Sequence, residues 1–168
     1  PERVLGLESA IRLFAAYDIV VDCTDAPGSR YLVNDAAVAA GRPLVAASSV
    51  SLSGQLTVYN LEGGPCLRCA FPEPPRGDAA EPVASCEEHG VLGPVPGVLG
   101  TLAAVEALKV LAGGALLRTC LKGRMLLYDA LDPSQLCRSM RISRRPDCPC
   151  CGGSAVAGPC PEVACACP

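Results

Sequence analysis

Two C-x-x-C pairs, far apart in the sequence, constrain this chain more than any other feature. The first is Cys66–Cys69 and the second is Cys148–Cys151, with residues 70–147 between them. Two thiolates at this spacing can hold one metal ion from a tight turn, and two such pairs supply the four ligands of a closed tetrahedral zinc site. Such a site would join distant segments and favour the folded chain. We therefore predict a structural Zn²⁺ ion bound by Cys66, Cys69, Cys148 and Cys151.

The cysteine content leaves other interpretations open. The chain has 12 cysteines in 168 residues, and the four could be unrelated buried or free thiols. Cys150 lies inside the second pair and could take the place of a neighbour. A disulfide framework is typical of short secreted domains with small cores. This chain is 50% hydrophobic and has no secretion signal, so reduced thiols in the cytoplasm fit better.

Composition excludes several classes of function. Net charge is −3, whereas a broad surface for nucleic acid or anionic membranes needs a basic excess. No apolar run long enough to cross a membrane is free of charges or repeated Gly and Pro. We expect neither nucleic acid nor membrane as a direct partner. The first residue is Pro1 and no signal-like run follows, so we expect the sequence to begin inside a longer chain.

A strand–helix–strand unit is the clearest pattern of secondary structure. Residues 18–23 form an apolar, β-branched run typical of a strand buried on both faces, and residues 43–47 form a second strand. The helix between them is expected to begin at Pro27, with Asp25 or Thr24 as its cap. Such crossovers imply a parallel sheet, so the chain is predicted to be α/β.

The remaining segments complete the predicted organisation. We expect a helix at 7–16, a half-exposed strand at 55–60, a loop at 63–82, a helix at 98–112, a hairpin of strands at 124–129 and 135–142, and a disordered tail at 153–168. The helix at 98–112 is apolar nearly all round, which predicts burial in a core or a subunit interface.

Two aspartates follow the first predicted strand. Asp22 and Asp25 lie at its carboxyl end, which is the edge where open α/β sheets bind ligands. A carboxylate there can hold Mg²⁺ beside a nucleotide. The alternative is that Asp25 only caps the next helix, and position alone does not decide between the two.

Two further segments have candidate chemistry. Cys86 lies in a polar stretch with His89 three residues on, and an accessible loop thiol can act as a nucleophile. An idle cysteine is the competing interpretation, because Glu87 and Glu88 would disfavour the thiolate. The glycine-rich stretch 90–100 leads into a helix without a preceding strand, so we interpret it as close packing and not as a phosphate loop.

Seven short segments form a recognisable combination. They are Tyr17–Asp25, Arg30–Asp35, Gly54–Tyr59, Gly64–Cys69, Gly90–Gly93, Glu106–Lys109 and the Cys148–Cys151 pair. In this order they resemble the ubiquitin-activating-like adenylyltransferases. The branch that the chain resembles most is the eukaryotic adenylyltransferase/sulfurtransferases of molybdopterin synthesis and tRNA thiolation. The resemblance covers roughly residues 7–152.

The resemblance implies a homodimer with a Rossmann-like, zinc-stapled fold and a mixed sheet, of which residues 1–152 would be the C-terminal part of an adenylation domain. It implies that Mg-ATP adenylates the C-terminal Gly-Gly of a ubiquitin-like sulfur carrier before sulfur transfer. Asp25 would then serve the Mg-ATP site, Cys86 would attack the acyl-adenylate, and the two cysteine pairs would bind zinc. An AMP ester is a far better electrophile than a carboxylate, and Mg²⁺ offsets phosphate charge.

The sequence also departs from this family. Its N-terminal half, with the glycine-rich nucleotide loop, is missing, as is the rhodanese domain that would supply sulfur. Ala26 stands where the family has Asn after the magnesium aspartate. We therefore expect the chain alone to be inactive. The alternatives are a non-catalytic zinc-binding interaction fragment and an activator of another ubiquitin-like modifier.

Overall fold

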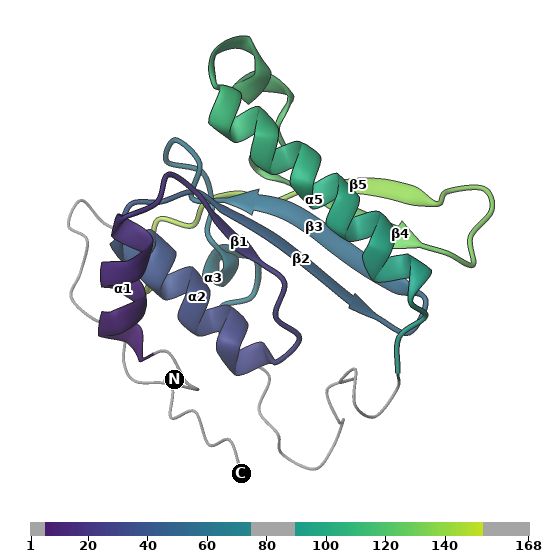
Figure 1. The fold of residues 1–168 in the computed structure, drawn as a ribbon, viewed down its shortest axis with the longest axis horizontal. Helices are drawn as coiled ribbons and strands as arrows, with labels where there is room; N and C mark the ends of the chain where they lie inside the picture. The colour runs from purple at the N-terminus through teal and green to yellow at the C-terminus, as the bar shows by residue number, and fades with distance from the viewer. Residues whose placement is uncertain (1–5, 75–89, 153–168) are drawn as a thin grey trace.

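A computed structural model describes residues 6–74 and 90–152. They form a five-stranded mixed sheet in the order β1-β2-β3-β4-β5, with helices on both faces (Figure 1). The elements are α1 Leu7–Ala15, β1 Val20–Asp22, α2 Pro27–Ala39, β2 Leu44–Val50, β3 Ser53–Tyr59, α3 Leu67–Ala70, α5 Pro94–Ala112, the 3₁₀ helix η1 Gly114–Thr119, β4 Arg124–Asp129 and β5 Cys137–Arg141. The predicted α/β class is confirmed.

The predicted strand–helix–strand unit is present as β1, α2 and β2. The two strands pair in parallel, with Val20 opposite Leu44. Strand β1 is shorter than predicted, and Val21 is 47% exposed, so the prediction of burial on both faces was wrong. The reason is position: β1 is the edge strand, and α5 packs over β2 and β3 on that face.

Helix α2 has the ends that its sequence encodes. It begins at Pro27. Proline has no backbone N–H group, and an N–H group at the first position of a helix would have no partner within the helix in any case. At the other end Gly41 adopts a φ of 65°, which a residue with a side chain rarely takes. The N–H of Arg42 donates to Ala37 O and that of Gly41 to Val38 O, which is a Schellman motif.

The rest of the sheet is antiparallel. Strand β3 pairs with β2 and β4, and β5 closes the predicted hairpin with β4. The prediction of a half-exposed β3 was wrong, because β3 is the middle strand and all of residues 56–59 are buried. Thr57 is tolerated there because its hydroxyl donates to the carbonyl of Arg124 at 2.7 Å.

The sheet separates two hydrophobic cores, because successive residues of a strand point to opposite faces. The core under α1 and α2 contains Ala10, Phe14, Ala36, Ala37, Leu44 and Ala46. The core under α5 contains Val45, Ala47, Leu56, Val58, Val95 and Leu99. Figure 1 shows α1 beside α2, and α5 as a separate long helix.

Helix α5 is buried on one side only. Val95, Leu99 and Ala103 face the sheet, whereas Leu108 on the outer side is 65% exposed. Within the described residues, the predicted burial is therefore confirmed only for the face of α5 that contacts the sheet. By length and apolar composition alone α5 could cross a membrane, although no such run was expected. Its packing is that of a helix covering a sheet.

The glycines of α5 do not pack closely, contrary to the sequence-based expectation. A Cβ atom added at Gly93, Gly97 or Gly100 would meet no described atom within 4 Å. All three residues are exposed, and the glycine spacing does not bring another segment into contact with the helix start.

Candidate functional site

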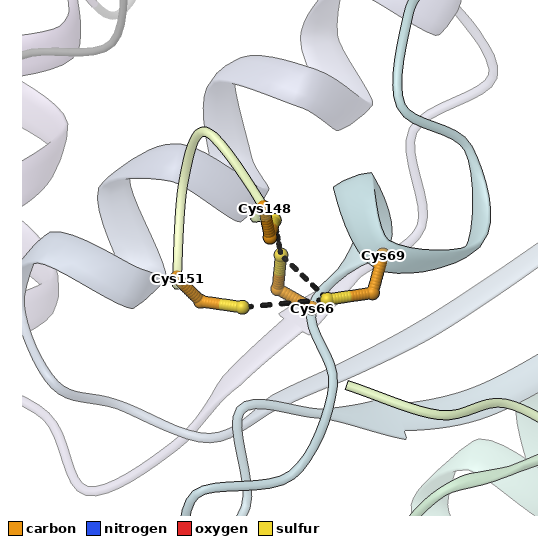
Figure 2. A group of neighbouring side chains, drawn as sticks. All are labelled: Cys66, Cys69, Cys148 and Cys151. Atoms are coloured by element: carbon orange, nitrogen blue, oxygen red, sulfur yellow. Dashed lines mark hydrogen bonds between the residues drawn. The ribbon is translucent and has the colours of Figure 1, made fainter. Parts of the chain in front are cut away.

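The two cysteine pairs converge on one point, as predicted. Their four sulfur atoms lie within 4.8 Å of one another, and Figure 2 shows the side chains pointing toward a common centre. The Sγ of Cys66 is 3.9 Å from that of Cys69 and 3.6 Å from that of Cys148, and the Sγ of Cys151 is 3.4 Å from that of Cys69. This convergence contradicts the alternative of four unrelated thiols. We call these four residues the thiol centre.

Local structure positions both pairs. Cys66 precedes α3 and Cys69 lies within it, so one turn of helix occurs inside the stretch that was predicted to be only loop. The second pair sits in a turn in which the N–H of Gly152 donates to Cys148 O at 2.9 Å. The N–H of Arg145 donates to the Sγ of Cys69 at 3.5 Å, which links the two segments.

The geometry fits a tetrahedral metal ion. Zinc–sulfur bonds of about 2.3 Å place the sulfurs of a tetrahedron about 3.8 Å apart, close to the spacings found here. Four soft thiolates are also the donor set that zinc prefers. All cysteines among the described residues are free thiols.

The thiols differ in how readily they ionise. A hydrogen bond with the Cys150 thiol, together with burial, raises the pKa of Cys66. Burial is also the main reason why the pKa values of Cys69 and Cys151 are raised. Burial acts in the same direction on Cys148, but hydrogen bonds from the N–H groups of Cys151 and Cys150 outweigh it and lower its pKa to about 7. The N–H groups of Cys150 and Cys151 therefore favour a thiolate at Cys148.

A buried amide on α2 joins the two segments of the thiol centre. Asn34 is fully buried, and its Oδ1 accepts the N–H of Leu67 at 2.8 Å. Its Nδ2 donates to Asp35 Oδ1 at 2.9 Å and to the Sγ of Cys150 at 3.6 Å. Asp35 in turn pairs with Arg68 of α3 through two hydrogen bonds of 2.9 and 2.7 Å. Helix α2 thus fixes the turn that carries Cys66 and Cys69.

An open cavity of about 650 Å³ lies at the carboxyl ends of β1 and β2. Its lining includes Asp25, Arg30, Gly54, Tyr128 and Arg138. The edge of the sheet where a ligand was expected is therefore hollowed, and side chains of both charges face the hollow.

The two candidate aspartates have different roles. Asp22 is buried and accepts hydrogen bonds from the N–H and hydroxyl of Thr24 at 2.9 and 2.8 Å, which fixes the turn after β1. Asp25 is exposed in the cavity. The N-cap of α2 is Ala26, without a side-chain cap, so the alternative role of Asp25 or Thr24 as helix cap was wrong.

Sequence reasoning missed the arginines of the cavity. Arg30 lines it from α2, and its buried Nε has no hydrogen-bond partner among the described residues. Burial raises the pKa of Tyr59, and the charge of Arg30 partly opposes this. The available signal was the spacing of Arg30 and Asn34, one helical turn apart on an otherwise apolar stretch of α2.

Two segments from the sequence analysis remain, the glycine-rich stretch 90–100 and the stretch that contains Cys86. The start of α5 cannot hold a phosphate as a helix N-terminus usually does. Pro94 and Pro96 lack N–H groups, and the N–H groups of Val95 and Gly97 already bond to Leu92 O and Gly93 O. Cys86 and the tail 153–168 lie outside the described residues, so their roles stay predictions.

Comparison with known proteins places these features in a family. A profile of the ThiF family matches residues 2–150. The chain belongs to the ThiF family. This match includes the residues of the cavity and three of the four residues of the thiol centre, and it ends one residue before Cys151.

Curated relatives are similar in sequence but much longer. The chain is 54% identical over 150 residues to the adenylyltransferase and sulfurtransferase MOCS3 of Bos taurus, covering 89% of this chain and 31% of that protein. It is 44% identical over 152 residues to MOCS3 of Dictyostelium discoideum, covering 90% and 34%. It is 54% identical over 109 residues to UBA4 of Meyerozyma guilliermondii, covering 65% and 25%. The chain thus spans about a third or less of these relatives.

Solved structures share the fold at low sequence identity. E. coli MccB in complex with MccA-N7isoASN superposes with a TM-score of 0.65 at 18% identity, covering 89% of this chain and 45% of MccB. MccB with ATP gives a TM-score of 0.63 at 19% identity, covering 88% and 44%. The five-stranded mixed sheet with its helices is therefore also found in MccB.

Proposed function

We propose that this chain is part of an adenylyltransferase that uses Mg-ATP to activate the C-terminal Gly-Gly of a ubiquitin-like sulfur carrier. Membership of the ThiF family and the names of the relatives support the reaction class. The observation that carries the proposal is the position of Asp25. It is an exposed carboxylate, without a capping role, in an open cavity at the carboxyl edge of the sheet.

The residues of the cavity suit this chemistry. Asp25 offers oxygen ligands to Mg²⁺, which prefers carboxylates together with phosphate oxygens. Arg30 and Arg138 offer positive charge to phosphate or to the carboxylate of a peptide terminus. In the proposed reaction the carboxylate of the carrier attacks the α-phosphorus of ATP, pyrophosphate leaves, and an acyl-adenylate forms.

The finer assignments are part of the same proposal. Cys86 would attack the acyl-adenylate and release AMP, and the thiol centre would hold a structural zinc ion. We further propose that the whole protein is a cytoplasmic homodimer that acts in tRNA thiolation and molybdopterin synthesis, without direct binding to nucleic acid or membrane. Activation of another ubiquitin-like modifier is the competing substrate assignment.

The test is carrier-dependent exchange of pyrophosphate into ATP by the longer protein that contains this chain. Asp25→Ala should lower the exchange rate by about 10² or more, because charge on the phosphates loses its stabilising partner. Asp18→Ala is the matched control, since Asp18 is exposed and does not line the cavity, and should exchange at the parent rate. Near-normal exchange by Asp25→Ala would exclude a role for Asp25 in the reaction.

A further inference from the structure

A fifth thiol lies against the thiol centre. Cys150 packs against the cluster formed by Cys66, Cys69 and Cys148. The amide of Asn34 donates to the Sγ of Cys150 at 3.6 Å. The side chain of Cys150 is half-buried.

The two pairs differ in this respect. Between Cys66 and Cys69 stand Leu67 and Arg68, neither of which offers a soft ligand. Cys150 lies between Cys148 and Cys151. This segment therefore contains three thiols, although it has to supply only two of the four ligands of the metal ion. A tetrahedral ion takes only four of the five thiolates.

We propose that Cys150 is an alternate ligand that takes the fourth position of the metal site when Cys151 is lost, whereas nothing replaces Cys66 or Cys69. The inference rests on the proposed zinc site, but not on the proposed adenylation. In the exchange the Cys150 thiol gives its proton to water, and its sulfur forms the metal bond that the sulfur of Cys151 no longer makes. No oxidant or reductant takes part.

The position of Cys150 makes this exchange local. Its side chain already packs against the cluster that contains Cys66 and Cys69 of the opposite pair. The hydrogen bond from Asn34 also holds the sulfur of Cys150 beside the centre. The site keeps four thiolates and its net charge.

The experiment measures metal binding by the full 168-residue chain under reducing conditions. Four cysteines outside the described residues are first changed to serine so that they cannot supply a ligand: Cys86, Cys160, Cys165 and Cys167. Cys151→Ser, Cys69→Ser and the double variant Cys150→Ser with Cys151→Ser are made in this background. Each is titrated with Co²⁺, whose thiolate charge-transfer absorption reports the number of sulfur ligands, and then with Zn²⁺ in competition.

Cys151→Ser should bind one equivalent of Co²⁺ with the four-thiolate absorption of the background protein, and its affinity for Zn²⁺ should fall by no more than about 10- to 100-fold. Cys69→Ser and the double variant should both lose the four-thiolate absorption. The double variant differs from Cys151→Ser only at Cys150, so a difference between them reports Cys150 itself.

Three results would overturn the inference. One is a Cys151→Ser protein that loses the absorption as fully as Cys69→Ser, or that fails to fold. Another is a double variant that binds as Cys151→Ser does. The third is a background protein that binds no metal, which would also remove the zinc proposal. Because the readout is metal binding, none of these results depends on whether the longer protein makes an adenylate.

Discussion

Asn34 is a single side chain with three hydrogen bonds in a fully buried position. It accepts from the backbone of α3 and donates to Asp35 and to Cys150. A buried polar group is tolerated only when its partners are present. The amide therefore acts as a positioning group for the thiol centre, and its loss leaves the N–H of Leu67 buried without an acceptor.

We expect Asn34→Ala to lower the free energy of unfolding by about 1 to 3 kcal/mol, because it leaves a buried donor unsatisfied. Ser9→Ala is the control. Ser9 makes an exposed hydrogen bond to Gly6 O, and surface changes of this kind stay within about 0.5 kcal/mol. Urea unfolding of the reduced protein measures both. Equal stability of the two variants would contradict the role given to Asn34.

The residues of the site differed in how far sequence could predict them. The four cysteines were predicted because C-x-x-C spacing is a local property that fits one metal ion. Asp25 was placed correctly at the strand end. Whether Asp25 caps α2 could be decided only from the structure, in which Ala26 is the N-cap residue. Asn34 and Arg30 were missed, because the burial of a polar residue on a helix depends on what packs against it.

The crossing of β3 and α5 depends on one glycine. A Cβ atom at Gly54 would lie 2.2 Å from Leu99 Cδ1 and 2.7 Å from Ser48 O. The carbonyl belongs to the neighbouring strand and cannot move without disturbing the ladder. The absence of a side chain at Gly54 therefore sets how closely the helix approaches the sheet beside the cavity.

Gly54→Ala should destabilise the protein by about 1 to 3 kcal/mol through overpacking. The matched change Gly97→Ala lies in α5, where an added Cβ meets nothing within 4 Å. It should stabilise by about 0.5 to 1 kcal/mol, because Gly is a poor helix former. Thermal unfolding of the two variants should shift in opposite directions. A neutral Gly54→Ala would show that α5 does not pack as closely as described.

Elements with strong local patterns were predicted well. The β-branched run of β1, the helix after Pro27 and the hairpin of β4 and β5 all formed. The burial of β3 was misjudged, because alternating residues indicate one exposed face only when no helix covers it, and α5 comes from a distant segment. The start of α5 was placed too late, because prolines at its first turn resemble a loop although they suit a helix start.

At the scale of the molecule, the thiol centre joins α3 to the segment at 148–151. We expect removal of metal by a chelator to lower the midpoint of urea unfolding, because binding that occurs only in the folded state adds to its stability. Acidification should have the same effect, because the ligands bind as thiolates. Cys137→Ser, which removes an exposed thiol outside the centre, should respond as the parent does. Unchanged unfolding after chelation would contradict the stabilising role.

The chain alone should not form carrier-AMP from Mg-ATP and a Gly-Gly-ended sulfur carrier. The described residues contain Asp25 and two arginines at the cavity, but the first turn of α5 offers little to a phosphate, because Pro94 and Pro96 have no N–H group and those of Val95 and Gly97 are already bonded. Each missing preorganised donor typically costs about 10² to 10³ in rate. Mass spectrometry of the carrier decides the question. Detection of the adenylate would show that these residues hold the nucleotide without help from the missing part of the protein.

The two edges of the sheet differ in what they can pair with. Strand β5 is exposed along its whole length and includes Arg138 and Arg141, and such charges discourage an incoming strand. Among the described residues nothing pairs with the outer side of β1, where the apolar Val21 is exposed. Of the two edges, β1 is therefore the one at which the sheet can take up a further strand.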